Sequence, residues 1–235
     1  MDLTHQQTAL SGTSIDIGAA LEFAKSDPDW MKKCGMHGLV MLIPIAGFLA
    51  LFGWGRKIFE NAKNDERILP ELDIGGEISY GIPPLVAMLN PAAIILPLMI
   101  VIMGIGMAGG MISGVVGGDA GGIIGIVMMV ITFGLYGVFM LLAFGLQLLT
   151  PEIQRRGYNG EMGPLFSPGS SLRAIKANPK AFVMTFIGLF VANFIGGLGV
   201  IACYVGMFLT VPFGHAMAAH ILAQWDAIVQ RSEAI

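Results

Sequence analysis

Charged residues and cysteines are scarce in this chain. Only 12% of its 235 residues are Asp, Glu, Lys or Arg, whereas about a quarter of a typical soluble protein is charged. The net charge of -3 provides no basic surface that could neutralise phosphates, so we expect no nucleic-acid partner. Cys34 and Cys203 lie in or beside apolar stretches without a C-x-x-C pattern and are expected to be packing residues.

Sequence patterns that indicate a reaction or a bound metal are also missing. There is no G-x-S-x-G, Walker loop or H-E-x-x-H pattern, and no pair of carboxylates lies within an apolar run. His215 and His220 are five residues apart, so they lie on different faces of a helix. We therefore predict a protein that is not an enzyme, with no catalytic residue, no metal and no cofactor.

Long apolar runs dominate what is present. Hydrophobic residues make up 55% of the chain and the mean hydropathy is +0.75, which is typical of an integral membrane protein. The apolar runs cover residues of about 34–55, 84–116, 123–149 and 181–223. Charged residues gather between them, in the expected aqueous loops 56–83 and 151–180. All four runs are predicted to be helical, so the fold class is all-α.

The same pattern divides the chain into three parts. Residues 1–26 are predicted to be a polar tail followed by an amphipathic helix at the membrane interface, which Thr13 and Asp16 would cap. Residues 27–225 are predicted to form a single multi-pass membrane domain. Residues 226–235 are predicted to be a short polar tail.

Proline and glycine interrupt the first and last apolar runs. These residues predict hinges or re-entrant turns at Pro44 and Gly47 in the first run, and at Gly196, Gly197 and Gly199 in the last. The two central runs, 84–116 and 123–149, are predicted to be two helices joined near residues 117–122. The predicted architecture is a membrane helical bundle in which a central transmembrane hairpin is flanked by two interrupted or re-entrant stretches. Four simple crossings are the alternative.

Basic residues give the expected orientation. They flank the first apolar run and occupy both charged loops, whereas the turn at 117–122 has none. Because Lys and Arg near membrane ends stay on the cytoplasmic side, we expect the charged loops and the termini to be cytoplasmic.

Glycines recur at four-residue intervals in the central run. We predict that one helix face carries the packing residues Gly106, Gly110, Gly114 and Gly118, with Gly122 in line and an offset row at Gly117, Gly121 and Gly125. Small residues at this spacing let another backbone approach closely in lipid. The contact could be within the chain or between subunits, and residues 117–122 could instead form a simple turn.

Polar groups within apolar runs are candidates for a polar path, because such groups are costly in lipid. The candidates are Asn90, Asp119 and Asn193. The alternative is that the two asparagines form structural hydrogen bonds and that Asp119 lies in a solvated turn.

Several short motifs resemble a known family. They are Asp27-Pro28-Asp29-Trp30, Leu42-Ile43-Pro44, Gly47, Gly53, Arg56, Leu69-Pro70, Asp73 and Gly81, then Asn178-Pro179-Lys180 and the stretch from Gly214-His215 to Gln224. Together they resemble DUF4013, an uncharacterised prokaryotic membrane family, over most of residues 27–225. The resemblance implies a multi-pass protein of a prokaryotic inner membrane and a constrained polar loop at Leu69–Asp73. It implies no activity.

Three functional hypotheses follow. The first is a non-enzymatic membrane component whose partners are lipids and either further copies of itself or a larger membrane complex, joined through the glycine face. The second is a transporter or channel for ions or small solutes. The third is a membrane-shaping protein.

Overall fold

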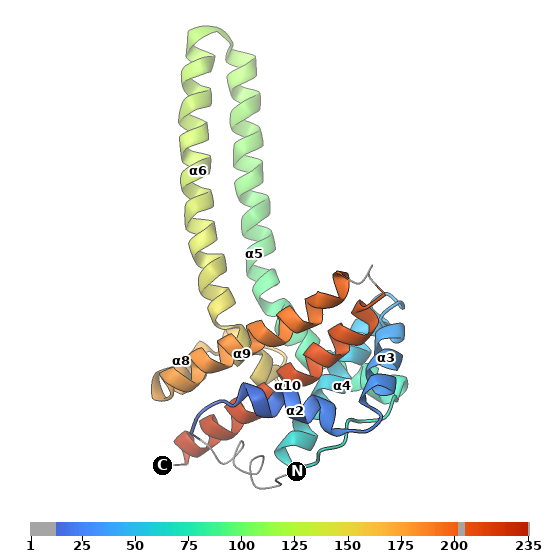
Figure 1. Ribbon diagram of the computed structural model, residues 1–235. Coiled ribbons are helices and arrows are strands. Elements are labelled where there is room, and N and C mark those ends of the chain that lie inside the picture. The colour runs from blue at the N-terminus through green and yellow to red at the C-terminus, as the bar shows by residue number, and fades with distance from the viewer. Residues whose placement is uncertain (1–12, 202–204, 235) are drawn as a thin grey trace. The chain divides into compact units, whose positions relative to one another are not determined.

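The computed structural model describes residues 13–201 and 205–234 and is helical throughout its regular structure (Figure 1). The polar tail expected at residues 1–12 lies outside these ranges. The helices are α2 (Ile17–Ser26), α3 (Trp30–Val40), α4 (Ala46–Lys63), α5 (Ile74–Val116), α6 (Gly118–Leu148), α7 (Thr150–Tyr158), α8 (Pro168–Ala177), α9 (Pro179–Gly197) and α10 (Met207–Glu233), with short 3-10 turns η1 (Pro164–Phe166) and η2 (Leu198–Val200). The all-α prediction is confirmed.

Three helical stretches in the described residues are long and apolar enough to cross a membrane. They are Ile74–Val116, Gly118–Leu148 and Pro179–Val200. Helix α5 begins at Ile74, ten residues before the apolar run predicted from 84. Polar residues form this start, since Asp73 accepts the N–H of Gly76 and Glu77 accepts the N–H of Asp73. The first apolar run contains no such stretch, since it is divided between α3 and α4.

The chain forms two compact units. Unit 1 comprises the residues up to Met88 together with those from Pro151, and unit 2 is Leu89–Thr150. Helix α5 therefore contributes its first turns to unit 1 and its remainder to unit 2. Each unit is described by itself.

Helix α10 is the core of unit 1. It is buried on several faces by α9, α4, α3 and α2, and Met217, Ile221, Leu222 and Trp225 are fully enclosed. Helix α2 is docked on it by Gln224, whose amide Nε2 donates to the carbonyl of Asp16 while its Oε1 accepts the Asp16 N–H. The apolar face of α2, which we expected to face the membrane surface, carries Phe23 stacked on His220 of α10.

Both interrupted runs of the sequence are helix breaks. Helix α3 ends at Val40 and α4 begins at Ala46, with Pro44 between them and Gly47 in the first turn of α4. Helix α9 ends at Gly197, η2 contains Gly199, and α10 begins at Met207. Glycines then let the helices meet. A Cβ on Gly47 would overlap the backbone at Val40, and one on Gly214 would overlap the carbonyl of Ala192.

A close crossing in unit 1 joins α4 to the start of α5. A Cβ on Gly53 would overlap the carbonyl of Glu77, and one on Gly81 would overlap the carbonyl of Leu49. Two helices can approach this closely only where both lack side chains. The crossing holds the first turns of α5 in unit 1.

We expect Gly53→Ala and Gly81→Ala to destabilise unit 1, each by about 1–3 kcal/mol, because overpacking forces the backbones apart. Gly35→Ala on α3 is the matched control, since a Cβ there meets nothing within 4 Å. The measurement is the thermal unfolding midpoint of the full chain in detergent. Equal midpoints for all three variants would contradict the close crossing.

Candidate functional site

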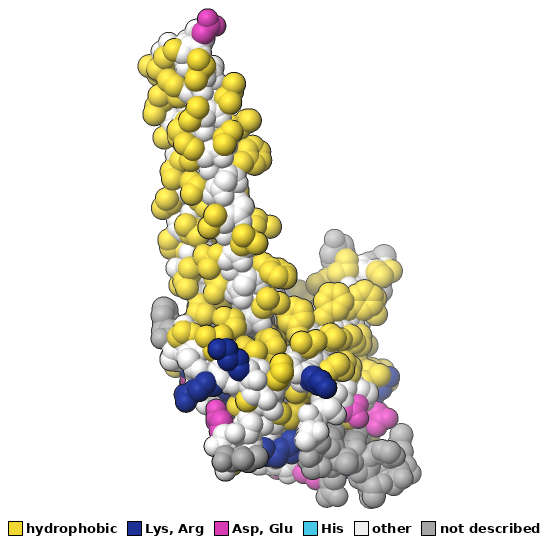
Figure 2. Space-filling model, turned by 90° about the vertical axis from the view of Figure 1, so that its left-hand side faces the viewer, with side chains coloured by type: hydrophobic (Ala, Val, Ile, Leu, Met, Phe, Trp, Pro, Cys, Tyr) yellow, Lys and Arg dark blue, Asp and Glu magenta, His cyan; other side chains and the backbone are white. Residues whose placement is uncertain are grey.

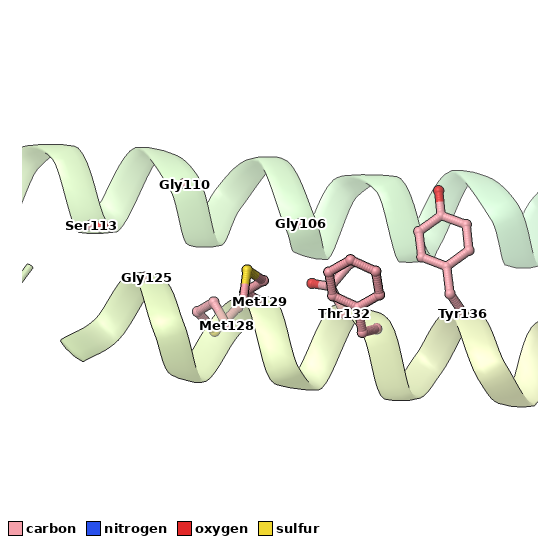
Figure 3. A pocket seen from close by; sticks show the side chains of 9 residues that line it. Gly106, Gly110, Ser113, Gly125, Met128, Met129, Thr132 and Tyr136 are labelled. Atoms are coloured by element: carbon pink, nitrogen blue, oxygen red, sulfur yellow. The ribbon is translucent and has the colours of Figure 1, made fainter. Parts of the chain in front are cut away.

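Unit 2 carries an apolar groove between α5 and α6 (Figure 3). Its volume is about 350 Å³. The lining comes from both helices: Gly106, Gly110 and Ser113 of α5, and Gly125, Met128, Met129, Thr132, Phe133 and Tyr136 of α6. On the α5 side of the groove, Gly106 and Gly110 leave the backbone uncovered. The α6 side is formed by longer side chains such as Met129 and Phe133.

Small residues hold the two helices of unit 2 together. A Cβ on Gly109 would lie 2.7 Å from the Cβ of Met128, and one on Gly125 would lie 2.9 Å from the Ser113 hydroxyl. The same hydroxyl donates to the carbonyl of Gly121 at 2.6 Å. Helix α5 therefore contacts α6 through hydrogen-only positions and one serine.

The predicted glycine row divides between three surroundings. A Cβ on Gly106 would lie 3.3 Å from Thr132, so this position faces α6. Around Gly110 and Gly114 there is nothing within 4 Å of a Cβ. Gly118 begins α6 next to the connecting residue Gly117, and both have a positive φ, of +57° and +62°. A Cβ on Gly118 would also meet nothing within 4 Å. Within the row, Gly110 and Gly114 are thus the open positions that lie inside α5.

Two contact residues of unit 2 were missed from the sequence. Gly109 and Ser113 were not predicted to be packing residues, because only glycines at intervals of four were considered. Including serine and intervals of three, as in Gly106, Gly109 and Ser113, would have found this face.

The remaining surface of unit 2 is apolar. Exposed side chains along α5 include Met107, Met111 and Val115, and those along α6 include Val130 and Leu141. Hydrophobic side chains cover the length of this unit in Figure 2. Its single charged residue, Asp119, is exposed in the first turn of α6. Asn90 is buried near the other end of the unit. The two proposed path residues Asn90 and Asp119 are therefore not brought together.

A smaller, more polar pocket lies in unit 1 beside the break between α9 and α10. Its volume is about 240 Å³. It is lined by Phe52, Met88, Gln154, Tyr158, Ala192, Asn193, Gly196, Gly197, Val211, Gly214, His215 and Ala218. Three residues predicted from the sequence, Asn193, Gly196 and Gly197, are brought together here. Gly199 lies apart from the pocket, against Thr210 and the backbone of Gly206.

The polar groups of this pocket are neutral and mostly paired. The hydroxyl of Tyr158 and Nε2 of His215 are 3.0 Å apart, and the imidazole also bonds to the backbone of Leu51. Asn193 donates its amide to the carbonyl of Leu189 at 2.8 Å. Burial raises the pKa of Tyr158, so the phenol stays protonated. The pocket therefore suits a neutral solute that forms hydrogen bonds.

Tyr158, His215 and Gln154 were not predicted as site residues. Gln154 and Tyr158 come from α7 and His215 from α10, and Tyr158 and His215 are 57 residues apart in sequence. No local spacing links them, so only the tertiary fold brings the pair together.

Buried charges hold the polar loop between α4 and α5. The Nζ of Lys33 lies 2.7 Å from Asp27 and donates to the carbonyl of Leu69, while the N–H of Leu69 donates to Asp27 at 3.0 Å. Trp54 adds a hydrogen bond from Nε1 to the carbonyl of Pro70. The start of the Leu69–Asp73 segment is therefore fixed by side chains from α3, α4 and the α2–α3 junction.

A second ionic cluster joins α7 to the end of α10. Asp226 pairs with Arg155 at 2.6 Å and with Lys63 at 2.7 Å, and Glu152 pairs with Arg155 at 2.6 Å. Trp225 donates its Nε1 to Glu152. The carboxylates are fully buried and satisfied by these partners, which suits a structural role. Within the described residues, no three His, Cys, Asp or Glu side chains come together as a metal site.

Asp27→Asn should destabilise the fold by about 3–5 kcal/mol, the range for breaking one partner of a buried ion pair. Asp27 and Lys33 are both nearly inaccessible. Glu60→Gln, in the more exposed Arg56–Glu60 pair, is the control and should change stability by less than about 1 kcal/mol. Denaturant titration of both variants gives the comparison. Equal losses of stability in the two variants would contradict a structural role for the Asp27–Lys33 pair.

Acid should weaken the same pair. Burial by itself would raise the pKa of Asp27, but hydrogen bonds from Lys33 and from the N–H groups of Asp29 and Leu69 outweigh it and lower the pKa below its ordinary value of 3.8. The stabilisation is therefore present above that value and is lost as the pH falls through the lower, folded-state pKa. In an acid titration the wild type should lose more stability below about pH 4 than Asp27→Asn does, and parallel curves would exclude this contribution.

Comparison with known sequences gives one family. The family described as a protein of unknown function (DUF4013) matches residues 36–205. No curated protein and no solved structure matches the chain. The matched residues cover both units, and run from within α3, through α5, α6 and α9, to just before α10. The predicted resemblance is confirmed: this membrane protein belongs to the DUF4013 family.

Proposed function

We propose that this protein is a non-enzymatic membrane component that associates with a second copy of itself through the groove of unit 2. The observation that carries the proposal is the open backbone at Gly110 and Gly114 beside a ridge on the same helix. Met107, Met111 and Val115 form that ridge, each one position further along α5 than Gly106, Gly110 and Gly114.

A groove next to a ridge suits a two-fold interface. In a symmetric pair the same patch occurs on both subunits, so the ridge of one copy can fill the groove of the other. Association in lipid depends on such close packing, because lipid tails are as apolar as the side chains and supply no hydrophobic drive. Each open glycine also lowers helix stability by about 1 kcal/mol relative to alanine, which close contact with a partner would offset.

The proposed setting is the inner membrane of a prokaryote, with the charged loops and termini in the cytoplasm. Lys and Arg occur in the loops 56–83 and 151–180 and are absent from the turn 117–122, which supports this orientation. In this setting α5 and α6 cross the bilayer as a hairpin, with Asp119 at the outer turn. Lipids are the remaining partners.

Gly110→Ile and Gly114→Ile should weaken self-association at least about tenfold, a change of about 1.4 kcal/mol. A side chain at 110 would fill the groove that Gly110 lines, and one at 114 would cover the open backbone one turn further along α5. Gly104→Ile is the matched control, because Gly104 is also exposed with nothing within 4 Å of a Cβ but is turned about 120° from Gly110 around α5 and does not line the groove. The measurement is energy transfer between labelled copies diluted in lipid bilayers. The proposal fails if all three variants associate like the wild type.

Transport of a small neutral solute is the second candidate function. The observation that favours it is the pocket of unit 1, where a broken helix brings Asn193 beside Tyr158 and His215. Broken helices and exposed backbone form the substrate sites of many transporters.

Vesicles containing the wild type should then take up a neutral solute such as glycerol faster than empty vesicles. Gly197→Leu should abolish the difference, because position 197 lines the pocket and has space for a side chain. Gly169→Leu on α8, at an equally open position outside the pocket lining, should not. Uptake equal to that of empty vesicles would remove this candidate.

A further inference from the structure

The α3–α4 turn and the α9–α10 turn lie at the same end of unit 1. A Cβ on Gly38, near the end of α3, would overlap the carbonyl of Phe208, near the start of α10. Further along the same two helices, the rings of Trp30 and Phe213 are 5.1 Å apart. The two turns are therefore neighbours, although about 160 residues separate them in sequence.

Both turns expose large apolar side chains. We call them the turn surface, which consists of Leu42, Ile43, Ile45 and Phe48 from the first turn and Val200, Ile201 and Val205 from the second. Ile45 is 73% exposed and Ile201 is 82% exposed. Neither residues 34–55 nor residues 181–222 contain an Asp, Glu, Lys or Arg.

The turn surface continues along α9. Helix α9, continued by η2, exposes an apolar stripe at helical spacing, which consists of Val183, Ile187, Phe190 and Phe194 of α9, Leu198 of η2 and the following Ile201. Its opposite face, with Thr185, Leu189 and Ala192, is buried in unit 1. Pro179–Val200 is long and apolar enough to cross a membrane, and its stripe is continuous with the turn surface at Ile201.

Charged residues of unit 1 gather away from the turns. The Asp27–Lys33 pair lies at the beginning of α3, and Lys63 meets Asp226 at the other end of α4. In Figure 2 hydrophobic side chains cover the upper part of unit 1, and its charged side chains lie below them.

Most N–H groups of the first turn are satisfied internally, which suits a hydrocarbon environment. The N–H groups of Met41, Leu42, Ile43, Ala46 and Gly47 all donate to backbone carbonyls, and Pro44 has no N–H. Among described residues 41–47, Ile45 is the one whose N–H does not donate to a backbone carbonyl. The Ala46 N–H bonds to the carbonyl of Pro44 at 2.7 Å across Ile45, whose φ is +64°. This is a γ-turn, a strained form that closes the chain within three residues.

The legs of the first turn have the length of one leaflet. Ten residues separate the exposed Lys32 from Leu42, and ten separate Ala46 from Arg56. At 1.5 Å per residue each leg spans about 15 Å, which is half of the roughly 30 Å of hydrocarbon in a bilayer. The α3–α4 stretch is therefore long enough to reach the middle of the membrane and too short to cross it.

We propose that the turn surface lies in the hydrocarbon of a single membrane leaflet, near the bilayer midplane, with Lys32 and Ile68 exposed on the same aqueous side. Its partner is the acyl-chain interior of the membrane. The α3–α4 stretch is accordingly re-entrant, and unit 1 is held in the membrane by it as well as by α9.

The test uses nitroxide labels on the full chain in phosphatidylcholine–phosphatidylglycerol vesicles, in a background with Cys34→Ala and Cys203→Ala. Labels are placed at Ile45→Cys and Ile201→Cys. Ile68→Cys is the matched control, since Ile68 is 65% exposed but lies in the charged loop. Labels at 45 and 201 should collide with oxygen and not with a water-soluble nickel chelate, and the label at 68 should do the reverse. Each variant must keep the helicity and elution volume of the background protein.

Two results would overturn the proposal. The first is collision with the nickel chelate at 45 and 201 as strong as at 68, which would place the turn surface in water. The second is protection of these labels from both reagents, which would mean that protein, such as a second copy, covers the surface.

A topology measurement completes the test. Lys32→Cys and Ile68→Cys should react with a membrane-impermeant maleimide from the same side of sealed vesicles, because the re-entrant stretch returns to the side it came from. Reaction from opposite sides would show that residues 34–55 cross the membrane and would contradict the proposal.

Discussion

Each residue carries a backbone N–H and C=O, and in hydrocarbon these groups find partners only within the protein. This constraint accounts for the main features of the chain. Its apolar runs are helical, and the first helix break forms hydrogen bonds within itself through the γ-turn at Ile45. The connection between α5 and α6 is the single residue Gly117. Its N–H donates to the carbonyl of Ser113, and its carbonyl accepts the N–H of Gly121.

Helices that satisfy their own backbones still have to associate, and glycine makes this possible in both units. Gly53 and Gly81 bring α4 and α5 into backbone contact in unit 1. In unit 2, Gly121 brings α6 against the backbone of α5, and Gly109 brings α5 against the side chain of Met128. Buried ion pairs, in contrast to the glycines, connect loops and helix ends. Asp27 with Lys33, and Asp226 with Arg155, tie loops and helix ends of unit 1 together where the chain leaves the apolar regions.

The sequence was sufficient for the features that depend on local pattern. Apolar runs with few charges predicted a helical membrane protein, and the motifs from Asp27 to Gln224 predicted the family; both are confirmed. Helix breaks were expected at Pro44 and near Gly197, where proline and glycine punctuate the runs. The start of α5 was placed too late, because polar residues such as Glu77 hid a helix that the Asp73 cap begins.

Features that depend on long-range contacts could not be predicted in this way. The Tyr158–His215 pair joins α7 to α10, and the docking of α2 depends on Gln224, more than two hundred residues away. The glycine row at 106, 110, 114 and 118 looked uniform in sequence. Its members differ because Thr132 faces the first, and the last begins α6 with a positive φ.

Amide hydrogen exchange of the full chain in lipid vesicles tests most directly whether the membrane interior governs this fold. Residues 41–47 and 64–70 are both non-helical or nearly so, and in water both would exchange quickly. If the first turn is in hydrocarbon and satisfied internally, peptides covering 41–47 should exchange as slowly as the helices beside them, while 64–68 exchange within seconds. Equally fast exchange in both segments would contradict the account.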